Sequence, residues 1–194
     1  MFKIVFLTNN LNTLSLYEWL KTKKYIEMFL DSMSKIEPDL IISYRYKYLI
    51  KPDIINRFMN SIINLHNSFL PWNRGTQPNF WSFLLDTPKG VTIHLINEGI
   101  DTGDILFQKR IEFNDGQETL RSSYEKLNIS IQELFKNNWD RIKNKSYKFI
   151  NQNSEGSIYY KKDFEKIRNI LGPYGWDIPI KLLKKRYQKY LNLV

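Results

Sequence analysis

Short apolar runs alternate with helical patterns over the first third of the chain, and this alternation limits the fold more than any other feature. The runs are KIVFLT at 3–8, DLIISY at 39–44 and SIINLH at 61–66. Between them, apolar residues recur at helical spacing, over the segments 11–20, 25–36 and 52–59. Strands that alternate with helices predict an α/β fold with a doubly wound, mostly parallel sheet.

The pattern changes after residue 79. A short helical stretch is expected at 80–85, after a loop over 67–79. The segments 90–96 and 104–113 alternate in polarity like antiparallel strands. Apolar residues at 120–145 then share one face, which predicts a single long amphipathic helix whose aromatic side chains belong to the core.

Turn residues at 151–156 separate the rest of the chain from a short tail. We expect residues 1–150 to form the main domain and residues 151–194 to form a small helical and hairpin appendage. The tail ends in IKLLKKRYQKYL at 180–191, which is a basic amphipathic pattern. Such a helix either binds a membrane or nucleic acid, or simply exposes its charged face to water.

Composition excludes several classes of protein. The 194 residues contain no cysteine, so disulfides, thiolate nucleophiles and cysteine-based metal clusters are ruled out. Two histidines exclude a histidine-rich metal site, and no metal is expected. No apolar run approaches the roughly 20 residues of a membrane span, and the N-terminal run is too short for a signal peptide. A cytoplasmic protein without a membrane partner is therefore expected.

The formal charge of +9 favours an anionic partner. Nucleic acid, a phosphorylated metabolite and acidic lipid all satisfy this condition. Lysine is frequent throughout the sequence, however, so the charge does not define one patch. We therefore do not expect nucleic acid as the partner.

Two polar residues interrupt the third apolar run near its end. Asn64 and His66 are two positions apart, so they share one face of the expected strand. At a strand end, a neutral imidazole accepts a proton while a carboxamide polarises a carbonyl group. The alternative is a simple turn or edge feature. His94 alternates with apolar neighbours in 90–96, and we interpret it as a structural histidine.

Other polar segments are expected at the same edge, because ligands bind at the carboxyl ends of strands in open α/β sheets. These are the Asn9 turn, the loop YRYKYLI at 44–50 and the acidic turn IDTGD at 100–104. A carboxylate from this turn would fix the tautomer of His66 and hold its protonated form.

Three segments together resemble a known family. PDLIISY (38–44), INLHNSFLPWNRG (63–75) and GVTIHLINEGIDTGDILFQ (90–108) are similar to the formyltransferases that use N10-formyltetrahydrofolate, which have a Rossmann-like fold. The resemblance implies that Asn64 donates to the formyl oxygen, His66 accepts a proton from the attacking amine, and Asp101 partners them, without a metal. It also implies that backbone groups hold the pterin, and in this chain these belong to Tyr48, Leu49, Ile50, Asn97, Glu98 and Ile100.

Within the family, LPWNRG, PNFWSF, DTPKGVTIH and GSIYYKKDFEKI most resemble the nucleotide-sugar N-formyltransferases. This resemblance implies a dTDP-linked 3- or 4-amino-deoxy sugar as substrate, a role in glycan biosynthesis and a homodimer as a candidate assembly. The residues then expected to bind the substrate are Asn9, Trp72, Arg74, Tyr159, Tyr160 and Lys161.

Several alternatives stay open within this family resemblance. The tail is short for the C-terminal barrel of the methionyl-tRNA enzymes, and TNN (8–10) lacks the phosphate-loop glycine of the glycinamide ribonucleotide enzymes. The stretch before DLIISY is also short for the family, so an abbreviated N-terminal part of the sheet is expected. Formylation of either of those other amines, hydrolysis of formyl-folate, and an inactive binding module remain as alternatives.

Overall fold

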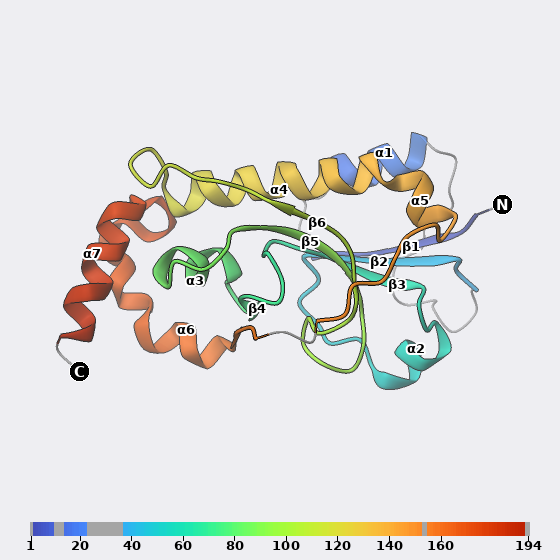
Figure 1. Ribbon diagram of the computed structural model, residues 1–194, viewed down its shortest axis with the longest axis horizontal. Coiled ribbons are helices and arrows are strands. Elements are labelled where there is room, and N and C mark those ends of the chain that lie inside the picture. Colours follow the sequence, from blue (N-terminus) through green and yellow to red (C-terminus); the bar gives the residue numbers. More distant parts are fainter. Residues whose placement is uncertain (1, 10–13, 23–36, 153–154, 193–194) are drawn as a thin grey trace.

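A five-stranded sheet forms the centre of the computed structural model, which describes residues 2–9, 14–22, 37–152 and 155–192 (Figure 1). The sheet contains, in spatial order, β1 (Ile4–Leu7), β2 (Leu40–Tyr44), β3 (Ile62–His66), β5 (Gly90–Leu95) and β6 (Ile105–Arg110). β1, β2 and β3 are parallel, and β5 is antiparallel to both β3 and β6. Four of the five strands therefore share one direction, which confirms the predicted α/β fold with a mostly parallel sheet.

Helices cover both faces of the sheet (Figure 1). One face packs against α1 (Leu14–Thr22), α4 (Leu120–Asn137) and α5 (Trp139–Lys143), and the other packs against α2 (Pro52–Arg57). In β1, Ile4 and Phe6 enter the core under α1 and α4, whereas Val5 and Leu7 enter the core beside α2. Burial on both faces explains why these strands read as continuous apolar runs.

A second apolar cluster lies at the end of the molecule that carries the C-terminus (Figure 1). It is built by α3 (Pro78–Leu84), α6 (Lys161–Ile167), a 3₁₀ segment (Arg168–Asp177) and α7 (Ile180–Leu191). Beside it, β4 (Arg74–Gly75) pairs in parallel with β7 (Ile158–Tyr159). This pairing brings the segment after residue 155 next to the loop that follows β3.

The predicted single helix over 120–145 is wrong, because the chain breaks between α4 and α5. α4 begins at a reciprocal cap between Thr119 and Ser122, which is typically worth about 1 kcal/mol. At its other end, the amide of Asn138 donates to the Leu134 carbonyl oxygen at 2.8 Å. A side chain that competes for a helix carbonyl favours a break at this point.

Two smaller differences concern segment boundaries. The predicted strand 104–113 ends at Arg110, and the expected loop over 67–79 contains β4 and the start of α3. The predicted helix at 25–36 lies outside the described residues. Among the described helices, none is both long enough and apolar enough to cross a membrane.

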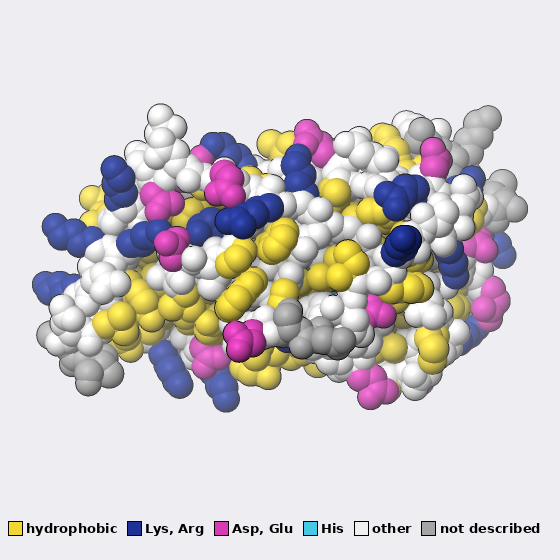
Figure 2. Space-filling view, in the orientation of Figure 1, with side chains coloured by type: hydrophobic (Ala, Val, Ile, Leu, Met, Phe, Trp, Pro, Cys, Tyr) yellow, Lys and Arg dark blue, Asp and Glu magenta, His cyan; other side chains and the backbone are white. Residues whose placement is uncertain are grey.

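Basic side chains are spread over the visible face in Figure 2, and several extend from the end of the molecule that α7 forms. Neither histidine is visible on this face, in agreement with exposed fractions of 8% for His66 and 1% for His94. The positive charge is therefore spread over this face of the protein, and both imidazole rings are buried in its interior.

Candidate active site

Asn64 and His66 lie on one face of β3, near its carboxyl end. The sheet changes from parallel to antiparallel at this strand, because β5 is its neighbour. Across this pair, Asn64 lies opposite His94 and His66 lies opposite Thr92. Opposite residues in an antiparallel pair share a face, so β5 adds His94 to the predicted Asn64–His66 pair.

Asp101 joins these side chains from the turn after β5. Its Oδ1 accepts a hydrogen bond from Asn64 Nδ2 at 3.2 Å, and its Oδ2 accepts one from the Gly75 N–H at 2.8 Å. His66 Nδ1 lies 3.7 Å from Oδ2, and His94 Nε2 lies 3.4 Å from Oδ1. The structure therefore brings together the three residues that the sequence analysis put forward as catalytic.

The charge states in this cluster suit proton transfer. Burial lowers the pKa of His66, whereas the Asp101 carboxylate raises it and His94 lowers it further. Burial works to raise the pKa of Asp101, but His66, His94 and the Gly75 N–H hold it well below its ordinary value. At neutral pH the site therefore contains a neutral imidazole beside an ionised carboxylate.

Hydrogen bonding also identifies the free nitrogen of His66. His66 Nδ1 is the ring nitrogen on the side of Asp101, 3.7 Å from Oδ2. Nε2 is buried and has no hydrogen-bond partner among the described residues. With Nδ1 facing the carboxylate, Nε2 is the ring nitrogen left to accept a proton.

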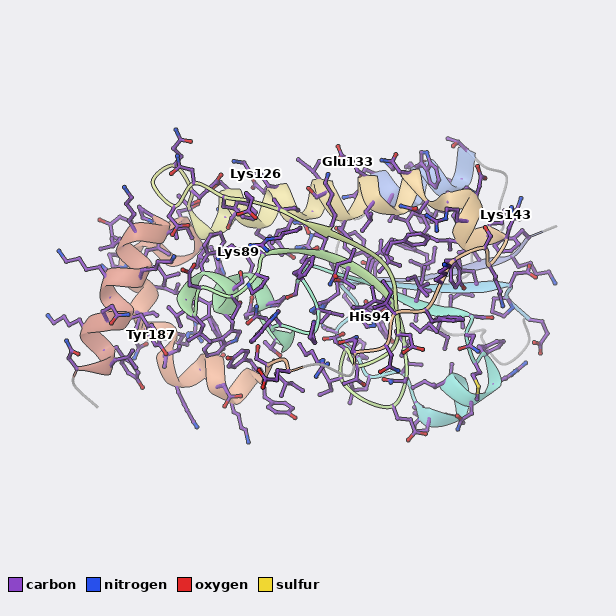
Figure 3. The ribbon with its side chains drawn as sticks, viewed as in Figure 1. Lys89, His94, Lys126, Glu133, Lys143 and Tyr187 are labelled. Carbon is purple, nitrogen blue, oxygen red and sulfur yellow. The ribbon has the colours of Figure 1, made fainter. Side chains whose placement is uncertain are left out.

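Figure 3 labels His94 among the side chains inside the molecule. Its contact with Asp101 brings it into the cluster, whereas its place in the sequence suggested a structural role. Its Nδ1 lies 2.7 Å from the Leu95 carbonyl oxygen, which can only accept, so Nδ1 carries the hydrogen. In the neutral ring Nε2 accepts from Asn64 Nδ2 at 3.3 Å, and in the protonated ring it donates to Asp101 Oδ1 at 3.4 Å. With His94 neutral, both hydrogens of the Asn64 amide point at neighbours, one at Asp101 and one at His94.

A metal ion is conceivable at three of these side chains. Ligand atoms of His66, His94 and Asp101 lie within 4.8 Å of one another. In the arrangement seen, however, the Asn64 amide directs its hydrogens at two of these ligand atoms. The geometry suits hydrogen bonding better than coordination, and the predicted absence of a metal stays a prediction.

Two cavities meet at this cluster. The larger cavity has a volume of about 620 Å³. All six residues predicted to surround the pterin line it: Tyr48, Leu49, Ile50, Asn97, Glu98 and Ile100. The smaller has a volume of about 400 Å³ and lies along β3 and the loops after β2 and β4. Asn64, Gly75 and Asp101 line both cavities, whereas His66 lines the smaller one.

The residues predicted to bind the substrate fall into two groups. Tyr159 and Tyr160 line the larger cavity, and the Tyr159 ring stacks on Trp81 with 4.1 Å between centroids. The others are not among the residues that line the two cavities: Asn9, Trp72, Arg74 and Lys161. Asn9 instead supports the loop after β2, since its Oδ1 accepts the N–H of Lys47 at 2.9 Å.

Arg74 is engaged with another side chain. Its Nε and Nη2 donate to Gln152 Oε1 at 3.1 and 2.9 Å. Gln152 Nε2 in turn donates to the carbonyl oxygens of Asp101 and Gly103, at 3.0 and 2.6 Å. Arg74 therefore contacts the site through Gln152, which holds the turn that presents Asp101.

Comparison with known proteins agrees with this geometry. The family model described as "Formyl transferase" matches residues 5–136. A methionyl-tRNA formyltransferase from Finegoldia magna is 40% identical over 104 residues, which are 53% of this chain and 33% of that protein. A dTDP-4-amino-4,6-dideoxyglucose formyltransferase from Mycobacterium bovis is 31% identical over 132 residues, covering 68% of this chain and 55% of that protein.

The crystal structure of the formyltransferase PseJ from Anoxybacillus kamchatkensis is similar over a longer range. It was solved in complex with UDP-4,6-dideoxy-4-formamido-L-AltNAc and tetrahydrofolate. Its TM-score is 0.86 at 41% identity, and the match covers 96% of this chain and 100% of that chain. By contrast, the chain spans 33% and 55% of the two curated relatives named above. The chain belongs to the formyl transferase family.

Proposed function

We propose that the protein transfers a formyl group from N10-formyltetrahydrofolate to the amino group of a nucleotide-linked amino sugar. One observation carries the proposal: two cavities meet at Asn64 and Asp101, and His66 lines the smaller one. A formyl donor in the larger cavity and an amine in the smaller cavity would meet at these residues. PseJ, which resembles this chain over nearly its whole length, was crystallised with tetrahydrofolate and a formamido sugar nucleotide.

Each of the three clustered side chains then has its own role in the formyl transfer. Asn64 donates an amide hydrogen to the formyl oxygen as negative charge develops there, and exchanges its contact with His94 to do so. His66 Nε2 accepts the proton of the attacking amine, and Asp101 stabilises the imidazolium that forms. A C–N bond to the sugar forms, the C–N bond to the folate breaks, and the proton passes to the folate nitrogen.

The larger cavity is the proposed folate site, with Tyr48 to Ile50 and Asn97 to Ile100 around the pterin. Residues 1–150 would form the catalytic domain and residues 151–194 an appendage, which adds Tyr159 and Tyr160 to the lining of this cavity. The sequence analysis instead predicted that these two tyrosines bind the sugar substrate. A homodimer and a cytoplasmic location remain predictions.

The nucleotide is proposed to be UDP, because the ligand of PseJ is a UDP sugar. The sequence analysis expected dTDP, and the mycobacterial relative is named for a dTDP sugar. Both nucleotides therefore belong in the test.

The direct test is incubation of the purified protein with N10-formyltetrahydrofolate and a panel of UDP- and dTDP-linked amino sugars. Formation of a formamido sugar together with tetrahydrofolate would support the proposal. Tetrahydrofolate released without sugar would indicate a hydrolase, and no product at all would favour an inactive binding module.

Methionyl-tRNA belongs in the same panel as a second candidate substrate. The 40% identity with the enzyme from Finegoldia magna favours its inclusion. Preference for the tRNA over every sugar nucleotide, with the steep salt dependence that phosphate contacts produce, would contradict the sugar assignment.

A further inference from the structure

Asn67 directly follows His66 and lines the smaller cavity. Its side chain is buried, with a residue exposure of 8%, and its Oδ1 has no hydrogen-bond partner among the described residues. His66 Nε2, in the same cavity, is also unpaired. Buried polar atoms are nearly always paired in native proteins, so two unpaired acceptors at one cavity point to a ligand that brings donors.

The orientation of the Asn67 amide follows from its neighbour. Asn67 Nδ2 donates to Asn128 Oδ1 at 2.7 Å, and the Tyr44 hydroxyl donates to the same oxygen at 3.3 Å. If the Asn67 amide were reversed, its oxygen would face the oxygen of Asn128. The unpaired atom of Asn67 is therefore the acceptor, Oδ1.

The orientation of Asn128 is fixed in turn by a chain of hydrogen bonds. Ser15 Oγ donates to Gln132 Oε1 at 2.6 Å, which leaves the Gln132 amide nitrogen as the donor. Burial raises the pKa of Tyr44 to about 12, whereas its hydrogen bond with Gln132 acts in the opposite direction, as expected when Gln132 donates to the phenolic oxygen. The Tyr44 hydrogen is then free to point at Asn128 Oδ1.

We propose that Asn67 is a specificity-determining residue whose Oδ1 accepts a hydrogen bond from the amine-bearing ring of the sugar, at the amine or at the donor group beside it. The inference rests on the proposed function, because it takes the smaller cavity as the sugar site. The acceptor and the base line the same cavity, so the acceptor selects substrates that carry an N–H or O–H near the reacting nitrogen. A pocket built to accept such a hydrogen discriminates strongly against an analogue that lacks it.

The experiment compares the wild-type protein with Asn67→Ala in steady-state kinetics, with sugar and folate varied separately. We expect the sugar KM to rise about tenfold or more in the variant, as is typical when a buried hydrogen bond is lost. The folate KM should stay unchanged, because Asn67 does not line the folate cavity. A structural defect alone would not produce this split between the two constants.

A control variant separates binding from stability. Asn138→Ala removes an amide that bonds to the Leu134 carbonyl at the break between α4 and α5. It should lower the melting temperature without changing either KM.

Each result has one meaning. If wild-type protein formylates the sugar and Asn67→Ala leaves the sugar KM unchanged, the assignment of Asn67 is overturned while the proposed function stands. If the wild-type protein neither binds nor formylates any amino-sugar nucleotide, the proposed function fails, and the assignment of Asn67 fails with it. Calorimetric titration of the sugar nucleotide in the presence of tetrahydrofolate supplies the binding result independently of turnover.

Discussion

Asn64 and His94 face each other across β3 and β5, with 3.3 Å between Asn64 Nδ2 and His94 Nε2. This contact holds the amide hydrogen that the proposed mechanism directs to the formyl oxygen. We expect His94→Gln to retain most activity, because its amide oxygen can replace Nε2 as acceptor. His94→Leu should lower kcat about tenfold, since Asn64 loses a neighbour that orients it. Equal activity of the two variants would contradict this role.

We expect the largest effects at two of the predicted catalytic residues, His66 and Asn64. His66→Ala and Asn64→Ala should each lower kcat by about two to three orders of magnitude, which is typical for a lost base or oxyanion donor. Circular dichroism should show an unchanged fold. Near-normal turnover by either purified variant would exclude the assigned role.

The pH profile depends on the charge of Asp101. Since burial keeps the pKa of His66 below its ordinary value of 6.5, we expect kcat/KM to fall only at pH values below this point. Asp101 raises the pKa of His66, so Asp101→Asn should move the acid limb to still lower pH while it reduces the plateau rate. The titration of the substrate amine is common to both enzymes, so the difference between their profiles reports on His66. A shift to higher pH would contradict the assignment.

Substitution of Arg74 distinguishes support of the Asp101 turn from a contact with the substrate phosphates. The structure leads us to expect that Arg74→Ala and Gln152→Ala lower kcat to a similar extent, by a few fold, because Arg74 acts through Gln152 on the Asp101 turn. The sequence analysis predicted a phosphate contact instead. A rise confined to the sugar KM in Arg74→Ala, absent from Gln152→Ala, would support that prediction.

Gly75 has no room for a side chain. A Cβ at this position would lie 2.4 Å from the Tyr159 carbonyl oxygen, and the φ angle of +86° is itself unfavourable for other residues. We expect Gly75→Ala to reduce both the melting temperature and kcat, since it displaces β7 and the N–H that binds Asp101. Differential scanning fluorimetry and turnover should change together, and an unaffected Tm would contradict the packing argument.

The sequence predicts the parts of the fold that depend on local pattern. Apolar runs buried on both faces identified β1, β2 and β3, and the i, i+2 spacing of Asn64 and His66 placed them on one face. The role of His94 depends on the register between β3 and β5, which no local pattern specifies. The partner of Arg74 likewise lies far along the chain, at Gln152, and loop-to-loop contacts of this kind have no signature in the sequence.

Because β7 pairs with β4, the larger cavity is complete only after β7 has been synthesised. Asn64, His66 and Asp101 emerge from the ribosome well before Gln152, which supports the acidic turn, and before Tyr159 and Tyr160, which line the proposed folate cavity. A nascent chain that ends before β7 would therefore carry the whole catalytic group with a cavity open on one side. Ribosome-bound chains of increasing length should gain affinity for folate only once β7 and the start of α6 have been released.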